Sequence, residues 1–390
     1  MDQREELVRL AQVAGSNKSR LCDRFRVSRQ KGYYKWQKRF ELAGRAGLAD
    51  RSRRPHHSPN RTDAMMEAAV LEVRARSNGA WGGRKIAEAL RRAGHVNVPA
   101  PSTVTAILRR HGALDQRAHE HPGPCQRFER AAPNELWQMD FKGHFALPVG
   151  RCHPLGVLDD HSRYALGLEA CGDEQEATVR GRLTAIFRRY GLPWEMLMDN
   201  GPPWGDAGDQ PYTALAVWLM WLGVHVTHGR PRHPQTQGKQ ERFHRTLNAE
   251  LLQGHSLRDL PECQSAFDRW RQIYNHDRPH DAIGLATPGE RYQPSPRSFP
   301  EQLPPIEYAS TDHVRKVDQM GWISFRNRRL HLSKAFRGLY VALRPAGEDG
   351  VFSVHFGIHH IDTLDLRTPA ARGSADVANA PSTDPRANQP

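Results

Sequence analysis

The chain has 390 residues, of which 38% are hydrophobic and 25% are charged, a balance typical of globular domains and unlike that of disordered or membrane-spanning chains. Its length suffices for about two to four domains, and no apolar run is long enough to cross a bilayer. Lys and Arg number 56 against 43 Asp and Glu, so the net charge is +13, the balance expected of a nucleic-acid binder, with a merely soluble basic surface as the equally weighted alternative. About nine of these surplus charges lie in residues 1–60.

Residues 5–42 show apolar positions at helical spacing, and within them Lys18–Phe40 has the texture of a helix, a tight turn and a second helix. Ser28 is a suitable N-cap for the second helix, although Gly32 inside it costs on the order of 1 kcal/mol. An ordinary three-helix bundle with a basic face is the alternative to DNA binding. We predict a helix-turn-helix DNA-binding domain over 1–55, whose outward side chains are candidates for base contacts: Arg29, Gln30, Lys31 and Lys35.

A second helical unit is predicted over 60–111, after a basic, proline-containing linker at 49–60. Its helices are expected at Asp63–Arg76, from the turn at Trp81–Lys85 to about Arg92, and from a cap at Ser102 through Arg110. The arrangement again favours DNA binding, and plain structural helices are the equally weighted alternative. The candidate DNA contacts are Arg84, Lys85, Ser102 and Thr103, and residues 112–133 are expected to form a linker.

Residues 134–292 change to strands alternating with helices. Three β-rich segments joined by short polar turns predict an antiparallel meander, and helices and short apolar strands follow. The pattern predicts an α/β domain with a mixed sheet and a site at one sheet edge. The expected strands are Leu136–Leu147, Cys152–Asp160, Arg163–Ala170, Glu195–Asp199 and Val224–His228; the expected helices are Thr178–Tyr190, Tyr212–Leu222, Gly238–Leu252 and Leu260–His276.

Residues 307–366 return to short strands, which predict a small β-barrel. The five expected strands are Gly321–Phe325, Arg328–Leu332, Leu339–Pro345, Val351–Phe356 and His359–Leu366. Residues 367–390 are rich in Ala, Pro, Ser, Asp and Asn and are expected to be a disordered tail.

Three acids stand at the ends of elements in the α/β region. Asp140 lies in a strand among apolar neighbours, Asp199 closes another strand, and Glu241 lies near the start of a helix. A carboxylate in such a place is costly to bury without a partner or a metal, and hard divalent cations prefer oxygen ligands. We therefore predict that these three acids hold metal. Asp159 and Asp160 are rival candidates, for which turn capping is the favoured role.

Six stretches carry a resemblance to a known family, and as an ordered set they are highly specific. The α/β region resembles the catalytic core of the retroviral-integrase superfamily, and the whole chain resembles bacterial insertion-sequence transposases of that type. The stretches are Leu136–Asp140 (LWQMD), Val157–Arg163 (VLDDHSR), Met198–Pro202 (MDNGP), His233–Phe243 (HPQTQGKQERF), Tyr274–His280 (YNHDRPH) and Thr287–Tyr292 (TPGERY).

The resemblance implies an RNase-H-like fold with an Asp-Asp-Glu triad that maps onto Asp140, Asp199 and Glu241 as catalytic and metal-binding residues. It implies two Mg²⁺ or Mn²⁺ ions per site and the chemistry of a transposase, which cleaves the 3′ ends of its element and joins them to target DNA. The 41 residues between Asp199 and Glu241 exceed the family's usual spacing, and we assign the surplus to a loop at 202–211.

The resemblance also implies double-stranded DNA as partner, at least a dimer on DNA, and a cytoplasmic, nucleoid-associated bacterial location without a membrane. On the helix of Glu241, the side chains expected to contact DNA are Lys239, Arg242, His244 and Arg245. A metal-dependent nuclease that only hydrolyses DNA is one alternative function. A domesticated DNA-binding regulator is the other.

Overall fold

The structure is a computed structural model that describes residues 2–50, 61–114, 129–201, 203–205, 212–229 and 238–367. The chain divides into two compact units, residues 1–62 and residues 63–390. The predicted basic linker from residue 51 on, most of the linker at 112–133, most of the loop at 202–211 and the predicted tail from residue 368 on lie outside the described residues.

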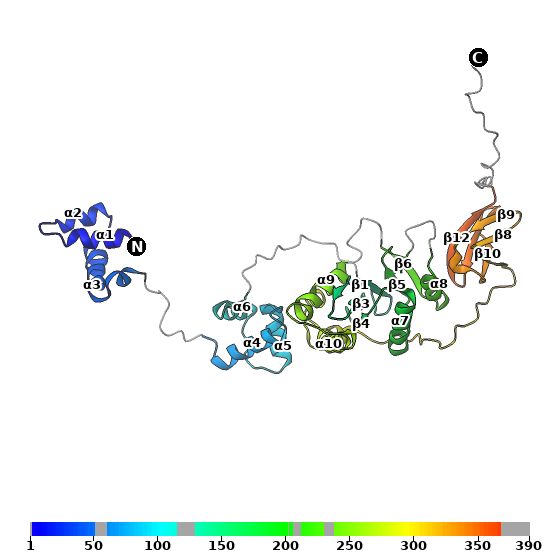
Figure 1. Ribbon diagram of the computed structural model, residues 1–390, viewed down its shortest axis with the longest axis horizontal. Coiled ribbons are helices and arrows are strands. Elements are labelled where there is room, and N and C mark those ends of the chain that lie inside the picture. The colour runs from blue at the N-terminus through cyan, green and yellow to red at the C-terminus, as the bar shows by residue number, and fades with distance from the viewer. Residues whose placement is uncertain are drawn as a thin grey trace, which may run out of the picture. The chain divides into compact units, whose positions relative to one another are not determined.

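The first unit is a small helical bundle around Leu7, Cys22 and Tyr33 (Figure 1). Its helices are α1 (Asp2–Ala11), α2 (Lys18–Arg24), the π-helical turn η1 (Arg29–Tyr33), α3 (Tyr34–Ala43) and the 3₁₀ turn η2 (Gly44–Leu48). The predicted cap is confirmed, because the Ser28 side chain accepts a hydrogen bond from the Lys31 backbone N–H (3.3 Å). Gly32 is explained as well: a Cβ there would lie 2.0 Å from Val27 Cγ1, so only glycine lets η1 close over the turn.

The second unit begins with three helices, α4 (Ala64–Arg76), α5 (Gly83–Arg92) and α6 (Pro101–Arg110), which share an apolar core. Asp63, the first residue of the predicted helix, is instead the N-cap of α4 and accepts a hydrogen bond from the Met66 N–H (2.8 Å). The predicted cap at Ser102 is wrong, because α6 begins at Pro101 and Ser102 lies inside its first turn. Proline suits that first position, where its missing N–H leaves no helical hydrogen bond unmade.

The α/β region contains one mixed sheet whose strand order is β2-β3-β1-β5-β6, with β4 paired to β3. β1, β3 and β4 form the predicted antiparallel meander, and β5 and β6 run parallel to β1. The predicted strand Leu136–Leu147 is two strands, because Gly143 takes a left-handed conformation (φ 86°) that breaks the ladder. The strands are β1 (Leu136–Phe141), β2 (Phe145–Ala146), β3 (Arg151–Asp159), β4 (Ala165–Cys171), β5 (Glu195–Met198) and β6 (His225–His228).

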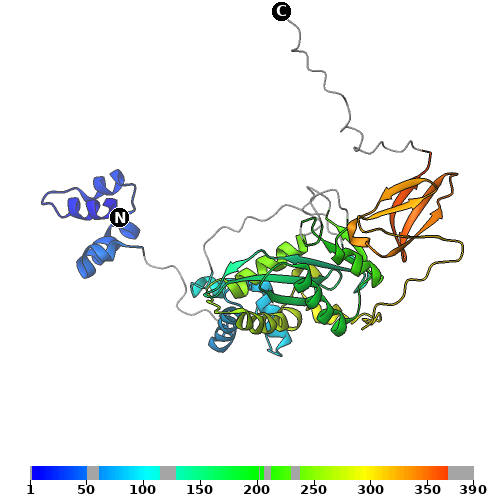
Figure 2. The same ribbon diagram turned by 45° about the vertical axis from the view of Figure 1, so that its right-hand side comes forward.

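Helices cover both faces of this sheet (Figure 2). On one face lie α7 (Glu176–Tyr190) and α8 (Ala214–Trp221). On the other lie α9 (Gly238–Leu247), which continues into the π-helical turn η4 (Asn248–Leu252), and α10 (Leu260–Gln272), which continues into η5 (Ile273–Asp277). The short elements η6 (Asp281–Ile283) and α11 (Pro288–Arg291) follow. In the part of the chain that is described, no helix is long and apolar enough to traverse a bilayer.

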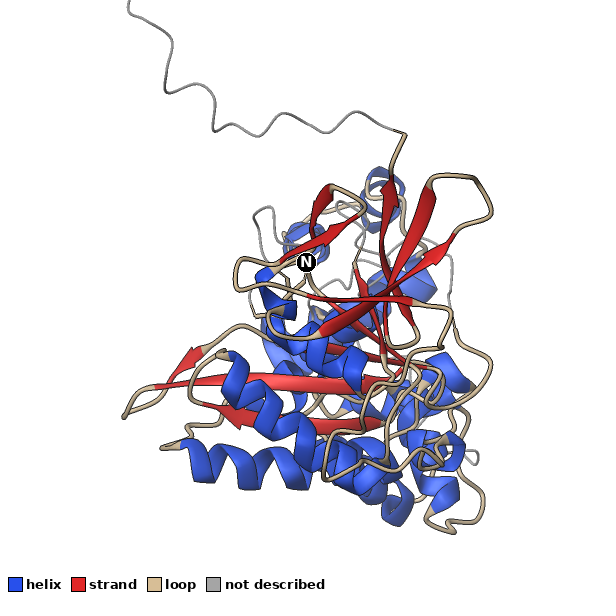
Figure 3. Cartoon of the chain, turned by 90° about the vertical axis from the view of Figure 1, so that its right-hand side faces the viewer, coloured by secondary structure: helices blue, strands red, loops and turns tan. Residues whose placement is uncertain are grey.

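The C-terminal strands form two open sheets and not the predicted small β-barrel (Figure 3). One sheet has the order β12-β11-β10-β7, and β8 pairs only with β9. Side chains from both sheets meet in one core, which also includes Val217 and Met220 of α8. The strands are β7 (His313–Lys316), β8 (Trp322–Phe325), β9 (Arg328–His331), β10 (Tyr340–Pro345), β11 (Val351–Phe356) and β12 (His359–Asp365), with the 3₁₀ turn η7 (Lys334–Phe336) after β9.

Candidate active site

Asp140 lies near the end of β1, directly opposite Gly156 of β3. A Cβ on Gly156 would lie only 3.1–3.3 Å from atoms of Phe243, Gln240 and His244, all on α9. The glycine therefore lets α9, the helix that carries Glu241, pack closely against the strand opposite Asp140. Gln240 fixes this contact, because its buried amide donates to the Gln138 carbonyl oxygen of β1 (2.7 Å).

Asp199 directly follows β5, the parallel neighbour of β1, and its side chain is exposed. The Asn200 N–H donates to Asp199 Oδ1 (2.8 Å), and His228 Nδ1 donates to the Asp199 carbonyl oxygen (2.9 Å). Glu241 is exposed on the first turn of α9. Sheet order and helix packing thus bring the three predicted acids to one edge of the sheet.

The electrostatics of Asp140 show that this edge is crowded with negative charge. Burial, together with the charge of Asp199, raises the pKa of Asp140 to about 7. Smaller contributions come from Glu174 and Glu241. Among the described residues no three His, Cys, Asp or Glu side chains lie close enough together to hold a metal ion. The charges that raise the pKa of Asp140 are those of other acids.

This donor set fits a hard divalent cation. Carboxylate oxygens are the ligands that Mg²⁺ and Mn²⁺ prefer, and a partly buried carboxylate held near other acids gains most from a bound cation. Asp140, Asp199 and Glu241 are the residues that would hold such ions.

Asp159 and Asp160, the rival acids, are buried and fully engaged in structural hydrogen bonds. Asp159 accepts from the Asn134 N–H (2.7 Å) and from both the N–H (2.7 Å) and the hydroxyl (2.6 Å) of Ser162. Asp160 accepts from the Gln138 side chain (2.7 Å) and the Arg130 N–H (2.9 Å), and it forms an ion pair with Lys239. These contacts hold the turn between β3 and β4 in place.

The basic residues of α9 divide into two groups. Lys239 faces inward to Asp160, whereas Arg242 and Arg245 are exposed on the outer side of the helix. His244 is nearly buried, and its Nδ1 lies 3.8 Å from Asp140 Oδ2. Burial, together with the charge of Lys142, lowers the pKa of His244 to about 4, so the ring is neutral near pH 7.

The candidate DNA contacts of the helical units are also divided. In the first unit all four are exposed: Arg29, Gln30, Lys31 and Lys35. In the second unit Ser102 and Thr103 are exposed on α6. Arg84 and Lys85 instead lie beside Asp281 of the α/β region, at 3.2 and 3.8 Å respectively.

Sequence reasoning missed Glu174, whose charge contributes to the raised pKa of Asp140 and whose Oε1 lies 2.8 Å from His153 Nδ1. No pattern in the residues around Glu174 predicts that it lies near Asp140. Glu174 lies just beyond β4 and reaches the site only because β4 pairs with β3, which in turn pairs with β1.

Comparison with protein families gives matches along most of the chain. Residues 130–234 and 222–288 match models of the integrase core domain, and residues 312–372 match the C-terminal domain of IS481 family transposases. Residues 3–56 match a helix-turn-helix domain, and residues 33–108 match a homeodomain-like domain.

Among curated proteins, the chain is similar to proteins of bacterial insertion elements. It is 25% identical over 237 residues to a 31.7 kDa protein of insertion element IS407 from Burkholderia multivorans, covering 60% of this chain and 82% of that protein. It is 28% identical over 160 residues to a 39.2 kDa protein of insertion element IS476 from Xanthomonas euvesicatoria, covering 40% of this chain and 44% of that protein.

Solved structures with a related arrangement come from retroviruses. A chain of the simian T-cell lymphotropic virus intasome is 15% identical with a TM-score of 0.39, covering 76% of this chain and 95% of that one. The HTLV-2 integrase catalytic core domain, solved in complex with magnesium, is 16% identical with a TM-score of 0.33, covering 42% of this chain and 99% of that one. Likeness at this level is too distant to carry a conclusion about this chain.

Proposed function

Since this chain belongs to the DDE transposases of insertion sequences, enzymes with an integrase-type, RNase-H-like core, we propose that it cuts and joins the ends of its own mobile element. It binds the terminal repeats, cleaves the phosphodiester at each 3′ end, and transfers the freed 3′-OH to target DNA. Both substrates are DNA of the host, so the enzyme acts on the bacterial nucleoid.

The observation that carries this proposal is the acidic sheet edge beside a basic helix. Asp140, with its pKa raised to about 7, lies on the strand next to the one that Asp199 follows. α9 adds Glu241 and, on its exposed side, Arg242 and Arg245. A site that holds metal cations and a scissile phosphate together needs acidic side chains for the cations and basic side chains for the phosphate within a few ångströms of each other.

The chemistry consists of two displacements at phosphorus. In the first, a water oxygen forms a bond to the phosphorus at the element end, the bond to the 3′ oxygen breaks, and that oxygen leaves as a 3′-OH. In the second, the 3′-OH oxygen attacks a target phosphodiester, a new phosphorus–oxygen bond forms, and the target strand leaves with its own 3′-OH. Neither displacement forms a covalent bond to the protein.

Bound cations would supply Lewis-acid stabilisation of the charge on the attacking and leaving oxygens. The chain itself does the rest. Asp140, Asp199 and Glu241 provide the oxygen ligands, and Arg242 and Arg245 hold backbone phosphates. Gly156 keeps α9 close to Asp140, so that these groups stay together.

We propose that the exposed side chains of η1 and α3 read bases, and that α6 does so through Ser102 and Thr103. Two element ends must be joined in one event, so we also propose at least a dimer on DNA. Light scattering of the chain with and without paired end DNA measures this, and a complex on paired ends that contains only one chain contradicts it.

The central experiment is a strand-transfer assay with a labelled end oligonucleotide, a plasmid target and Mg²⁺ or Mn²⁺. We expect label to become joined to the plasmid, and chelation of the cation to stop the reaction. Label that is cut but never joined would instead indicate a nuclease. Bound but uncut DNA in the presence of either cation would indicate a regulator.

A further inference from the structure

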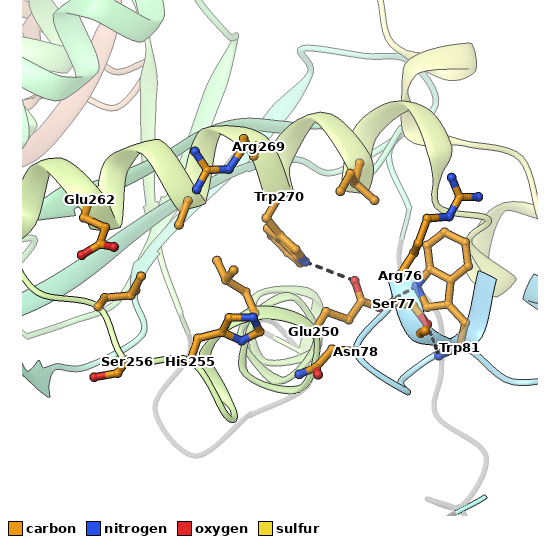
Figure 4. A pocket seen from close by; sticks show the side chains of 15 residues that line it. Arg76, Ser77, Asn78, Trp81, Glu250, His255, Ser256, Glu262, Arg269 and Trp270 are labelled. Carbon is orange, nitrogen blue, oxygen red and sulfur yellow. Dashed lines mark hydrogen bonds between the residues drawn. The ribbon is translucent and has the colours of Figure 1, made fainter. Parts of the chain in front are cut away.

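The three helices α4–α6 are attached to the catalytic region by a buried polar cluster centred on Glu250 (Figure 4). The Trp81 indole N–H donates to Glu250 Oε1 (3.0 Å), and the Trp270 indole N–H donates to Oε2 (3.2 Å). Arg278 Nε also donates to Oε1 (2.8 Å). Trp81 belongs to the turn before α5, whereas its partners lie 169 or more residues later in the chain. We call these four side chains the Glu250 cluster.

Further contacts continue the attachment on either side of the Glu250 cluster. At one end, the Asn78 amide donates to the carbonyl oxygens of Ala249 (3.2 Å) and Gln253 (3.0 Å). At the other, Arg92 forms an ion pair with Glu290 and donates to the Leu285 carbonyl oxygen (3.3 Å). Contacts at separated points along 78–92 fix the orientation of α5 as well as its distance from the catalytic region.

The Glu250 cluster restricts the angle at which α4–α6 dock on the catalytic region. The side chains of Glu250 and Arg278 are only 4% and 9% exposed and both belong to the catalytic region. A wrong docking angle of α4–α6 therefore removes the Trp81 hydrogen bond from a buried carboxylate. Each indole N–H also has a single direction in which it donates. An apolar interface would tolerate sliding, whereas this arrangement accepts one register. A pocket of about 480 Å³ borders Trp81, Glu250 and Trp270, so the surrounding packing does not by itself impose that register.

Glu250 lies on the same helical run as Glu241, because α9 continues without a break into η4. The two glutamates are nine residues apart, about two and a half helical turns. On the other side of the cluster, α5 packs against α6 through Ile86, Leu90 and Ile107. Gly83 tightens that contact, since a Cβ there would lie 2.3 Å from the Pro101 carbonyl oxygen. A continuous series of packed elements therefore runs from α6 to Glu241.

We propose that Glu250 is a positioning residue that fixes the distance between the DNA sequence read by α6 and the phosphodiester presented to the catalytic acids. The proposal rests on the function proposed above, in which α6 contacts the element ends. It gives Arg278 of the YNHDRPH stretch the role of holding the Glu250 carboxylate in place. Helices α4–α6 then set the distance to the cut as well as binding DNA.

The test compares the full-length wild type with Trp81→Phe. This variant keeps an aromatic ring but removes the indole N–H that donates a hydrogen bond to Glu250. Cleavage of labelled end DNA is mapped to the nucleotide, on the native end and on ends with one to three base pairs inserted between the bound sequence and the cut. We expect the wild type to cut one bond and to lose about tenfold or more of its rate on the inserted ends. Trp81→Phe should spread its cuts over neighbouring bonds and discriminate less between the ends.

Trp221→Phe is the matched control, because it also removes an indole hydrogen bond (to the Pro304 carbonyl oxygen, 2.8 Å) but lies outside the Glu250 cluster. It should cut like the wild type. Asn78→Gly is a second test variant: it removes the exposed side chain and suits the left-handed backbone at this position (φ 50°), and it should also spread the cuts, though less. Cutting at one bond with wild-type discrimination by both test variants overturns the proposal. A wild type that does not bind or cut end DNA defeats the proposed function instead.

Discussion

Asp140 lies near the end of β1 and Asp160 directly follows β3, and their surroundings suit them to different roles. Asp160 has a hydrogen-bond or ionic partner on every side, including Gln138 and Lys239. Asp140 is partly buried beside Asp199, and no cationic side chain of the described chain neutralises it directly; His244, 3.8 Å away, is neutral near pH 7. An acid left in this state favours binding of a cation from solution, because a cation removes both the repulsion and the burial cost.

We expect Asp140→Ala, Asp199→Ala and Glu241→Ala each to lower strand transfer below about a tenth of the wild-type rate, because each removes oxygen ligands for the cations. Binding of end DNA should persist in a mobility-shift assay. Glu301→Gln is the control, since that carboxylate is 63% exposed and paired with Arg188, and it should react normally. Near-normal joining by one of the three alanine variants would remove that residue from the ligand set.

Lys85 provides a prediction about pH. Burial, reinforced by the nearby charge of Arg278, lowers its pKa to about 8. The folded protein therefore binds this proton less tightly than the unfolded chain, and the contribution of Lys85 to stability is present above pH 10.5 and is lost as the pH falls through 8. Lys85→Met should raise the free energy of unfolding by about 1–3 kcal/mol at pH 7.

Urea unfolding at pH 7, 8, 9 and 10 measures this effect. The gain from Lys85→Met should shrink as the pH rises, and Lys316→Met, at an exposed position, should show no such trend. A gain that is the same at pH 7 and pH 10 would show that packing, and not the ammonium charge, is responsible.

At the scale of elements, the packing of α9 against β3 is sensitive to volume. Gly156→Ala should lower the free energy of unfolding by about 1–3 kcal/mol and slow strand transfer, because Phe243 and Gln240 are buried and have little room to move. Gly181→Ala on α7, where a Cβ meets nothing within 4 Å, should stabilise by about 0.5–1 kcal/mol. Equal effects of the two substitutions in urea unfolding would contradict the close packing of α9.

Local pattern predicted most of the elements and the places of the three acids, because strand alternation, caps and turn residues lie close together in sequence. It failed where the cause lies elsewhere in the chain. β7 was missed, since four residues that include Arg315 and Lys316 carry too little apolar signal. The position of Arg84 and Lys85 beside Asp281, almost two hundred residues away, was not predicted, because nothing near α5 indicates it; their contact with DNA stays a prediction. The open C-terminal sheets likewise depend on which strands pair, and alternation is the same in an open or a closed sheet.

At the scale of the whole molecule, charge is concentrated at the N-terminal end, where residues 1–60 hold 15 Lys and Arg against 6 Asp and Glu. A chain that begins at residue 63 should bind DNA with a shallower dependence on salt. The slope of log affinity against log salt should fall by about 0.9 for each phosphate that the shortened chain no longer neutralises. Titrations of end DNA and random DNA between low and moderate salt measure both slopes, and an unchanged slope would assign phosphate binding to the second unit.

The C-terminal sheets have a consequence for the synthesis of the enzyme. They cover Val217 and Met220 of α8, and His359 of β12 donates to the Met220 carbonyl oxygen (2.9 Å) close to β6, the last strand in the sheet order. The ribosome synthesises this cover after the catalytic region, so until then the apolar side chains of α8 that it buries are open to solvent. A chain that stops short of residue 307 should therefore aggregate or be degraded, and a cell that translates the message incompletely gains no active transposase from the fragments.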